Sequence, residues 1–312
     1  MTFCEVFEQS SAILMEGAII ERIKHEYGLK LDPHLDLAGL IYDAKAVGAM
    51  TSIFDEYIDI AERYDLPFVM TTPTRRANKE RIALSKYDQE VLVENVKLLK
   101  AIRKNRRGPI FIGGLMGCKG DAYKATEVLS PEDAMLFHSW QADILSQAGV
   151  DFLYAGIMPA LSEACGMAKA MEQTGLPYII SFMIREDGRL IDGTSIHEAI
   201  VAIDAYTERP PICYMTNCVH PIILQKALSQ ECNQTETVYR RFKGIQANAA
   251  CLSPEALDGC THVETSSPQD LADDMIRLYD HLSPKIFGGC CGTTDKHMNA
   301  LAIVIQSHLN HK

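Results

Sequence analysis

Eight short apolar runs, each bounded by Gly or Pro, recur along the whole chain with amphipathic segments between them. Most of the runs are continuously apolar rather than alternating, a pattern typical of parallel strands that are covered on both faces. They begin at Ser11 (SAILMEG), Pro67 (PFVMTTP), Pro109 (PIFIGG), Asp151 (DFLYAGI), Pro177 (PYIISFMI), Pro211 (PICYMTNC), Phe242 (FKGIQANA) and Pro284 (PKIFGGCC). Eight strands alternating with helices in 312 residues predict an α/β fold, a (β/α)8 TIM barrel. An open doubly wound sheet is the alternative that this pattern leaves open.

The segments between the runs predict the helices of this fold. EDAMLFHSWQADILSQAG follows an SPED start and ends at Gly149, and SIHEAIVAIDAYTE begins at Ser195. Residues 18–66 predict two helices, around 34 to 47 and 50 to 64, where a barrel needs one. No repeat, low-complexity tract or linker rich in Gly, Pro and Ser divides the chain, so we expect one barrel domain over residues 1–312.

Charge and apolar content restrict the class of partner. The chain is 47% apolar with a formal net charge of −11, whereas a nucleic-acid or anionic-membrane surface needs clustered Lys and Arg. No apolar run reaches the roughly 20 residues that span a bilayer, and MTFCEVFEQS lacks the pattern of a secretory signal. We therefore expect a soluble cytoplasmic protein that acts on small molecules and binds no nucleic acid or membrane. Its ten cysteines are expected to be reduced, and a homo-oligomer is left open.

Three cysteines fall at predicted strand ends, which converge on the active-site rim of a barrel. Cys218 ends the sixth run, and Cys290 and Cys291 end the eighth. Adjacent side chains of a regular strand point to opposite faces, so the pair can share one ion only where the strand breaks; glycines on both sides supply that break. Three thiolates with an open fourth position predict a catalytic Zn²⁺ site. Small buried apolar cysteines, or a redox-active adjacent pair, are the alternatives.

Other residues near the rim carry weaker signals. The glycine-rich GGLMGCKGD from Gly113 lacks the Walker pattern of a phosphate loop, so a turn that lets substrate approach the backbone is favoured. Cys118 lies within this turn and could approach the metal rim. His220 follows Cys218 by two residues and is the one histidine of interest, with a role at a helix start as the alternative.

Several of these residues together resemble the homocysteine S-methyltransferase family, which includes betaine-, S-methylmethionine- and folate-dependent enzymes. The resemblance rests on GGCCGT near the C-terminus, the Asn217–Cys218 pair before Pro221, and MEGA around Glu16. QADILSQAGVDFL, PALSEA, TGLPYIISF and DGRLIDGTS extend it over most of the chain. It implies a (β/α)8 barrel in which Cys218, Cys290 and Cys291 are the zinc ligands.

The resemblance also implies a chemistry. A free alkyl thiol has a pKa near 8.5, and Zn²⁺ at such a site deprotonates the bound thiol for attack on a methyl group of a sulfonium or ammonium donor. No catalytic residue beyond the metal ligands is then needed. Glu16, Thr72, Asn217 and Asn248 form the expected substrate-binding set, although either Asn could instead cap the following helix.

Two positions depart from the family pattern. Glu16 stands where the family usually has Asp, and Gly156–Ile157 replace the Glu-Thr at the end of the fourth strand, so the acids that commonly bind the homocysteine amino group are altered. TTPTRRAN also replaces the usual TTNT-like stretch. We therefore expect homocysteine to be a poorer acceptor than a thiol that either lacks the α-amino group or is bulkier at that position. A zinc-binding barrel that senses a thiol or methylated ligand without turnover is the alternative function.

Overall fold

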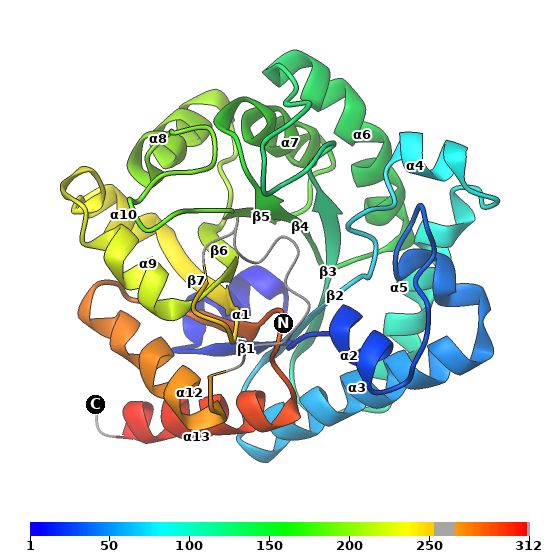
Figure 1. Ribbon diagram of the computed structural model, residues 1–312, viewed down its shortest axis with the longest axis horizontal. Coiled ribbons are helices and arrows are strands. Elements are labelled where there is room, and N and C mark those ends of the chain that lie inside the picture. Colours follow the sequence, from blue (N-terminus) through cyan, green and yellow to red (C-terminus); the bar gives the residue numbers. More distant parts are fainter. Residues whose placement is uncertain (253–265, 311–312) are drawn as a thin grey trace.

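The structure, a computed structural model, describes residues 1–252 and 266–310. Eight parallel strands form a closed barrel in sequence order, and β1 pairs with β8 through Ile13 and Ile286 to complete the ring (Figure 1). The (β/α)8 prediction is confirmed, and each predicted run overlaps one strand, although β3 continues to Gly117, beyond its run. The strands are β1 Ile13–Met15, β2 Phe68–Thr71, β3 Ile110–Gly117, β4 Phe152–Met158, β5 Tyr178–Phe182, β6 Cys213–Val219, β7 Phe242–Ala247 and β8 Ile286–Gly289.

Helices surround the strands, and their apolar faces make the larger part of the core (Figure 1). Their α-helical members are α1 Phe3–Gln9, α2 Ile20–His25, α3 Ala44–Arg63, α4 Lys79–Leu84, α5 Glu90–Arg103, α6 Pro131–Ala148, α7 Leu161–Gln173, α8 Ile196–Tyr206, α9 Pro221–Leu228, α10 Glu236–Arg241, α12 Pro268–Ile276 and α13 Asp295–Asn310. Three short 3₁₀ helices are η1 Ala38–Tyr42, η2 Glu231–Asn233 and η3 Arg277–Asp280.

The two helices best marked in the sequence are confirmed. The Ser130 side chain accepts a hydrogen bond from the Asp133 amide at the start of α6, and Gly149 ends this helix in the left-handed conformation, with φ of 82°. Ser195 and Glu198 form a capping box at the start of α8.

The two helices expected between the first two strands are wrong in their bounds. The first is the short 3₁₀ helix η1, and the second is α3, which starts earlier and continues through Gly48. The boundary is set by Asp43, whose carboxylate accepts hydrogen bonds from the amides of Lys45 and Ala46. Gly48 is exposed and lowers the stability of α3, but it does not end the helix. Burial of the long apolar face of α3 outweighs this loss.

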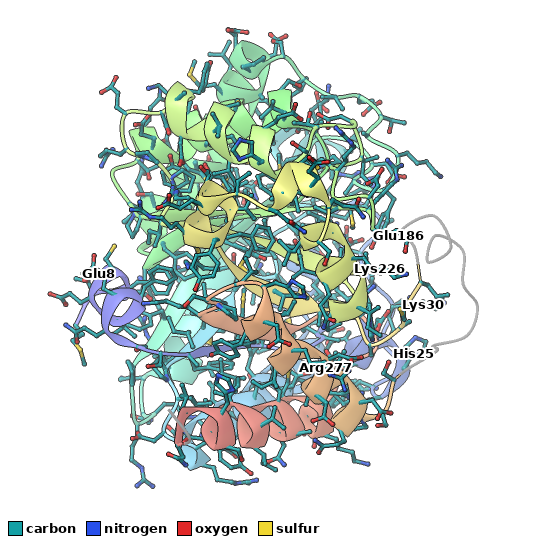
Figure 2. The ribbon with its side chains drawn as sticks, turned by 90° about the vertical axis from the view of Figure 1, so that its left-hand side faces the viewer. Glu8, His25, Lys30, Glu186, Lys226 and Arg277 are labelled. Atoms are coloured by element: carbon teal, nitrogen blue, oxygen red, sulfur yellow. A yellow bond between two sulfur atoms is a disulfide. The ribbon has the colours of Figure 1, made fainter. Side chains whose placement is uncertain are left out.

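The N-terminal helix α1 closes one end of the barrel. Phe3 of α1 stacks on Phe152 of β4 with ring centroids 4.1 Å apart, and it also contacts Phe111 of β3. These rings join a second apolar cluster inside the strands. In the side view, α1 with Glu8 lies at one end of the molecule, opposite the end at which Glu186 and Lys226 lie (Figure 2). The opposite end is therefore the one left for a site.

Within the described residues, no helix combines the length and the apolar character needed to cross a bilayer.

Candidate active site

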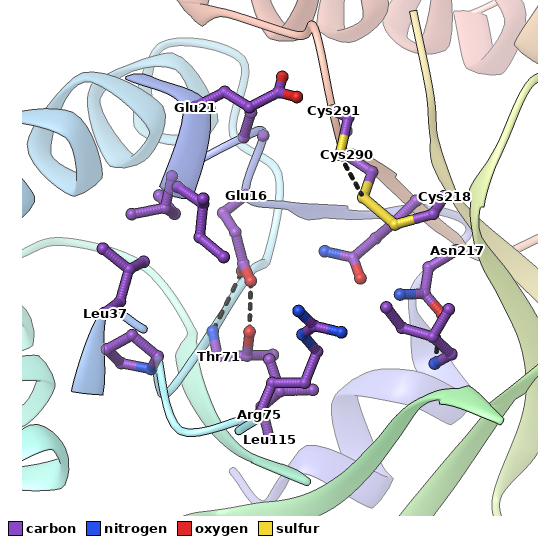
Figure 3. A pocket seen from close by; sticks show the side chains of 18 of the residues that line it. Glu16, Glu21, Leu37, Thr71, Arg75, Leu115, Asn217, Cys218, Cys290 and Cys291 are labelled. Atoms are coloured by element: carbon purple, nitrogen blue, oxygen red, sulfur yellow. Dashed lines mark hydrogen bonds between the residues drawn. A yellow bond between two sulfur atoms is a disulfide. The ribbon is translucent and has the colours of Figure 1, made fainter. Parts of the chain in front are cut away.

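A pocket with a cavity volume of about 190 Å³ lies at the carboxyl ends of the strands (Figure 3). Its wall comes largely from the segments that follow β1, β2 and β8, with one residue each of β3 and β7 and two each of β4 and β6. Six of the seven site residues predicted from the sequence line it: Glu16, Thr72, Asn217, Cys218, Cys290 and Cys291.

The three predicted metal ligands converge at one point of this pocket. β8 ends at Gly289, and the chain then turns so that the amide of Thr293 donates to the Cys290 carbonyl. Cys218 lies at an irregularity near the end of β6, with φ of 58° and a register shift in the pairing of β6 with β7. The three sulfur atoms therefore lie within 4.8 Å of one another, with Cys290 Sγ 4.0 Å from Cys291 Sγ.

Cys218 and Cys290 are paired as a disulfide, while Cys291 is free (Figure 3). Their Cα atoms lie 5.5 Å apart because β6 and β8 flank β7, and the reduced state expected from the sequence is the one in which all three cysteines can act as ligands. A metal ion needs both sulfurs as thiolates, so the ligand set belongs to the reduced protein. Three thiols on one rim fit a soft divalent ion such as Zn²⁺, and the pocket beside them leaves a fourth position for a ligand.

Glu21 and burial act on the third thiol. The Glu21 carboxylate accepts a hydrogen bond from the Gly292 amide next to Cys291. Burial, with a smaller contribution from Glu21, raises the pKa of the Cys291 thiol to about 12. This thiol stays protonated near pH 7 until a cation binds and displaces the proton.

Glu16 is a buried acid on the pocket wall. Its carboxylate accepts hydrogen bonds from the Thr71 hydroxyl at 2.5 Å and from the Thr71 amide at 3.1 Å (Figure 3). Burial nevertheless dominates and raises the pKa of Glu16 to about 7, although these hydrogen bonds favour the charged form. Glu16 can therefore accept a proton or bind a cation in the neutral pH range.

Asn217 supports the end of β4 and faces the pocket. Its Oδ1 accepts hydrogen bonds from the Ile157 amide at 2.9 Å and from the Ser181 hydroxyl at 2.6 Å. Ile157 has a φ of 55°, a conformation that a β-branched residue seldom adopts, so Asn217 stabilises a strained backbone. The Asn217 Nδ2 group is left to face position 156, since a Cβ there would lie 3.7 Å from it.

Thr72 and Asn248 are placed differently from the other predicted residues. The Thr72 hydroxyl is shared by Thr74 Oγ1 at 2.7 Å and by the Leu115 amide at 2.9 Å, so it is already engaged in fixing the wall. Asn248 follows β7 and is 1% exposed but does not line the pocket. Among the described residues, neither polar atom of its side chain has a hydrogen-bond partner. Substrate roles for both stay predictions.

The two weaker candidates do not join the thiol cluster. Cys118 donates to the Gly120 carbonyl at 3.5 Å and is outside the group of three sulfurs. His220 is the N-cap of α9, where its Nδ1 accepts from the Ile222 amide, as in the alternative interpretation.

Sequence reasoning missed several side chains of the pocket, among them Tyr154, Gln246 and Arg75. Tyr154 of β4 donates a hydrogen bond to Gln246 Oε1 of β7 at 2.9 Å, and both lie beside Glu16. Arg75 enters from the loop after β2. Tyr154 and Gln246 stand inside predicted strands, and the odd stretch TTPTRRAN contains Arg75, but only the register of the closed barrel shows that they face inward.

Similarities to known proteins agree with this geometry. A sequence model described as Homocysteine S-methyltransferase matches residues 13–305. Homocysteine S-methyltransferase 3 of Arabidopsis thaliana is 24% identical over 219 residues, which are 65% of this chain and 59% of that relative's own length.

Solved structures show the same barrel. The metallated form of the homocysteine methyltransferase MmuM from Escherichia coli superposes with a TM-score of 0.75 and 18% identity, covering 96% of this chain and 98% of that one. Its oxidized form gives a TM-score of 0.76 at the same identity and coverage. Because the family match spans nearly all of the barrel, this chain belongs to the homocysteine S-methyltransferase family.

Proposed function

We propose that this protein is a zinc-dependent S-methyltransferase that moves a methyl group from a sulfonium or ammonium donor to a small thiol, homocysteine or a related acceptor. The observation that carries the proposal is the convergence of Cys218, Cys290 and Cys291 at a single pocket. Bound to these sulfurs, Zn²⁺ would lower the pKa of an acceptor thiol at its open fourth position.

The methyl transfer itself needs little acid–base catalysis from side chains of the protein. A bond forms between the acceptor sulfur and the methyl carbon, while the bond from that carbon to the donor breaks and leaves its electron pair on the donor atom, which becomes neutral. The thiol proton passes to solvent. The side chains around the pocket then contribute mainly position, because two small molecules must meet in line.

Aromatic and acidic groups of the pocket support a cationic donor. Phe54, Tyr123 and Tyr154 line the cavity. Aromatic faces attract a sulfonium or ammonium group, and they attract the neutral product less strongly. Glu16 and Glu21 add negative charge when ionised. The partners proposed are thus a small thiol and a small methyl donor, and a cytoplasmic location remains part of this proposal.

The activity is tested with reduced, zinc-loaded protein. Homocysteine and other small thiols are assayed with S-methylmethionine, S-adenosylmethionine and betaine as donors, and the S-methyl product is measured by mass spectrometry. We expect product with at least one pair. Zinc binding without product from any pair would favour the non-catalytic alternative, a barrel that binds a thiol or methylated ligand.

The metal site is tested separately by its content. Protein purified without chelator and under reducing conditions is expected to hold about one zinc per chain, because three thiolates form a high-affinity soft site. Cys218→Ser and Cys291→Ser should each lose most of it. Cys232→Ser is the control, since this free cysteine in η2 is outside the pocket. Metal-free protein with titratable thiols would contradict the assignment.

A further inference from the structure

Arg75 extends a guanidinium group into the pocket of the three cysteines. It follows β2, and in Figure 3 its side chain points from the wall below Glu16 toward the centre of the cavity. Gly117 at the end of β3 makes room for it, because a Cβ at Gly117 would lie 2.8 Å from Arg75 Cγ and 2.9 Å from the Arg75 carbonyl oxygen. The stem of Arg75 is therefore held against β3.

The positive charge at this wall is only partly balanced. Arg75 and Arg76 share one carboxylate oxygen, Asp36 Oδ2, at 3.7 Å and 3.4 Å. These distances are longer than hydrogen bonds, so the Arg75 fork remains open to another acceptor. The guanidinium of Arg81 lies close to the same pair, and its pKa is lowered by burial and by Arg76. One carboxylate thus serves a cluster of cations.

The acids that line the pocket outnumber its two arginines, but two of the three acids are engaged by other groups. The described acids that line it are Glu16, Glu21 and Asp36. Glu16 is held by Thr71 and lies deep in the wall, and Glu21 is bound to the Gly292 amide beside Cys291. Arg75 and Arg76 are the two basic side chains among the described residues that line the pocket.

The end of β4 offers no acid to an ammonium group. Gly156 carries no side chain, and a Cβ placed there would meet Leu115 Cδ1 at 2.9 Å, so an apolar group fills that part of the wall. Arginine, by contrast, binds carboxylates through two parallel hydrogen bonds.

We propose that Arg75 binds a carboxylate of the acceptor, and that the preferred acceptors are small mercaptocarboxylic acids without an α-amino group. This inference rests on the proposed function, since it places the acceptor sulfur at the cysteines and the carboxylate at Arg75. It makes Arg75 a specificity-determining residue of the pocket.

Three matched thiols test the inference. Homocysteine without its amino group is 4-mercaptobutyrate, and homocysteine without its carboxylate is 3-aminopropane-1-thiol; propane-1-thiol lacks both. We expect 4-mercaptobutyrate to be at least as good as homocysteine in kcat/KM, and 3-aminopropane-1-thiol to be the poorest of the charged thiols. Calorimetric Kd values for the reduced, zinc-loaded protein should follow the same order.

Substitutions of Arg75 then separate its charge from its shape. Arg75→Gln should raise the Kd of 4-mercaptobutyrate about ten- to a hundredfold, the usual range for a charge-assisted hydrogen bond. The Kd of propane-1-thiol should not change. Arg75→Lys keeps the positive charge but cannot form two parallel hydrogen bonds to a carboxylate. It should therefore lose less affinity for 4-mercaptobutyrate than Arg75→Gln does. Arg76→Gln is the control for charge alone, because Arg76 also lines the pocket and pairs with Asp36, so the substitution removes one positive charge there while Arg75 stays.

The possible failures are distinct. If Arg75→Gln weakens all thiols equally, or Arg76→Gln has the same effect, the inference is wrong while methyl transfer stands. If no thiol is methylated, the proposed activity fails, and the calorimetric comparison still decides whether Arg75 selects a carboxylate. A wild-type preference for 3-aminopropane-1-thiol over 4-mercaptobutyrate would overturn the inference directly.

Discussion

Glu16 illustrates how one side chain can couple the pocket to pH. Its ordinary pKa is 4.5, and burial raises this to about 7 in the folded protein. A raised folded-state pKa means that the neutral carboxyl favours folding below the unfolded value, and that this stabilisation is lost as the pH rises to about 7. The difference of about 2.5 units corresponds to roughly 3 kcal/mol between acidic and alkaline pH.

We therefore predict that the change in the free energy of unfolding caused by Glu16→Gln, relative to the unsubstituted protein, is more favourable at pH 8 than at pH 5. The amide removes the cost of burying a charge at high pH, whereas at low pH it replaces a carboxyl that is already neutral. Urea unfolding at several pH values measures the difference. Glu132→Gln, at an exposed position of α6, controls for the loss of one acidic group. A difference that does not vary with pH would show that Glu16 titrates normally.

The site residues could be predicted from the sequence where they are of a rare type and stand next to Gly or Pro. Two adjacent cysteines between glycines, and an Asn-Cys pair before Pro221, are visible in the sequence. Arg75 is not, because an arginine in a loop is usually solvated, and only the room left by Gly117 turns it inward. The engagement of Thr72 by Thr74 and Leu115 is equally a product of tertiary packing.

Among the elements, strands were easier to predict than the helices that follow β1. A buried parallel strand is a continuous apolar run, and all eight were found in this way. The segment before α3 carries no such period, and its η1 helix ends where Asp43 caps α3. The inward-facing side of each strand depends on the register of a closed ring, which no single run specifies.

The helix α1 was not predicted, because seven residues are too few for a periodic signal. Its role can be tested with Phe3→Ala, which removes a ring that is 2% exposed and stacked on Phe152. We expect a loss of about 3–5 kcal/mol in the free energy of unfolding. Zinc content should not change, because α1 closes the end of the barrel opposite the pocket. Leu84→Ala, at a side chain that is 69% exposed, is the control and should cost little. An unchanged midpoint in Phe3→Ala would mean that α1 does not hold the barrel closed.

At the scale of the whole molecule, the thiol site and the fold are largely independent. The ring is closed by backbone pairing of β8 with β1 and β7, and the core is spread over the strands and the surrounding helices. The three cysteines stand at the ends of β6 and β8 on the rim. A structural zinc site, in contrast, supplies much of the folding free energy of a small domain.

We therefore predict that chelation removes the metal and the activity but leaves the barrel folded. Reduced, zinc-loaded protein is treated with a chelator, and zinc content, circular dichroism and methyl transfer are measured on the same sample. Zinc and activity should fall together while the helix signal stays constant, and added Zn²⁺ should restore the activity. The reductant must be kept throughout, because the pairing of Cys218 with Cys290 would otherwise block reloading. A cooperative loss of helix signal on chelation would show instead that the ion at the rim holds the ends of β6 and β8 together and is structural.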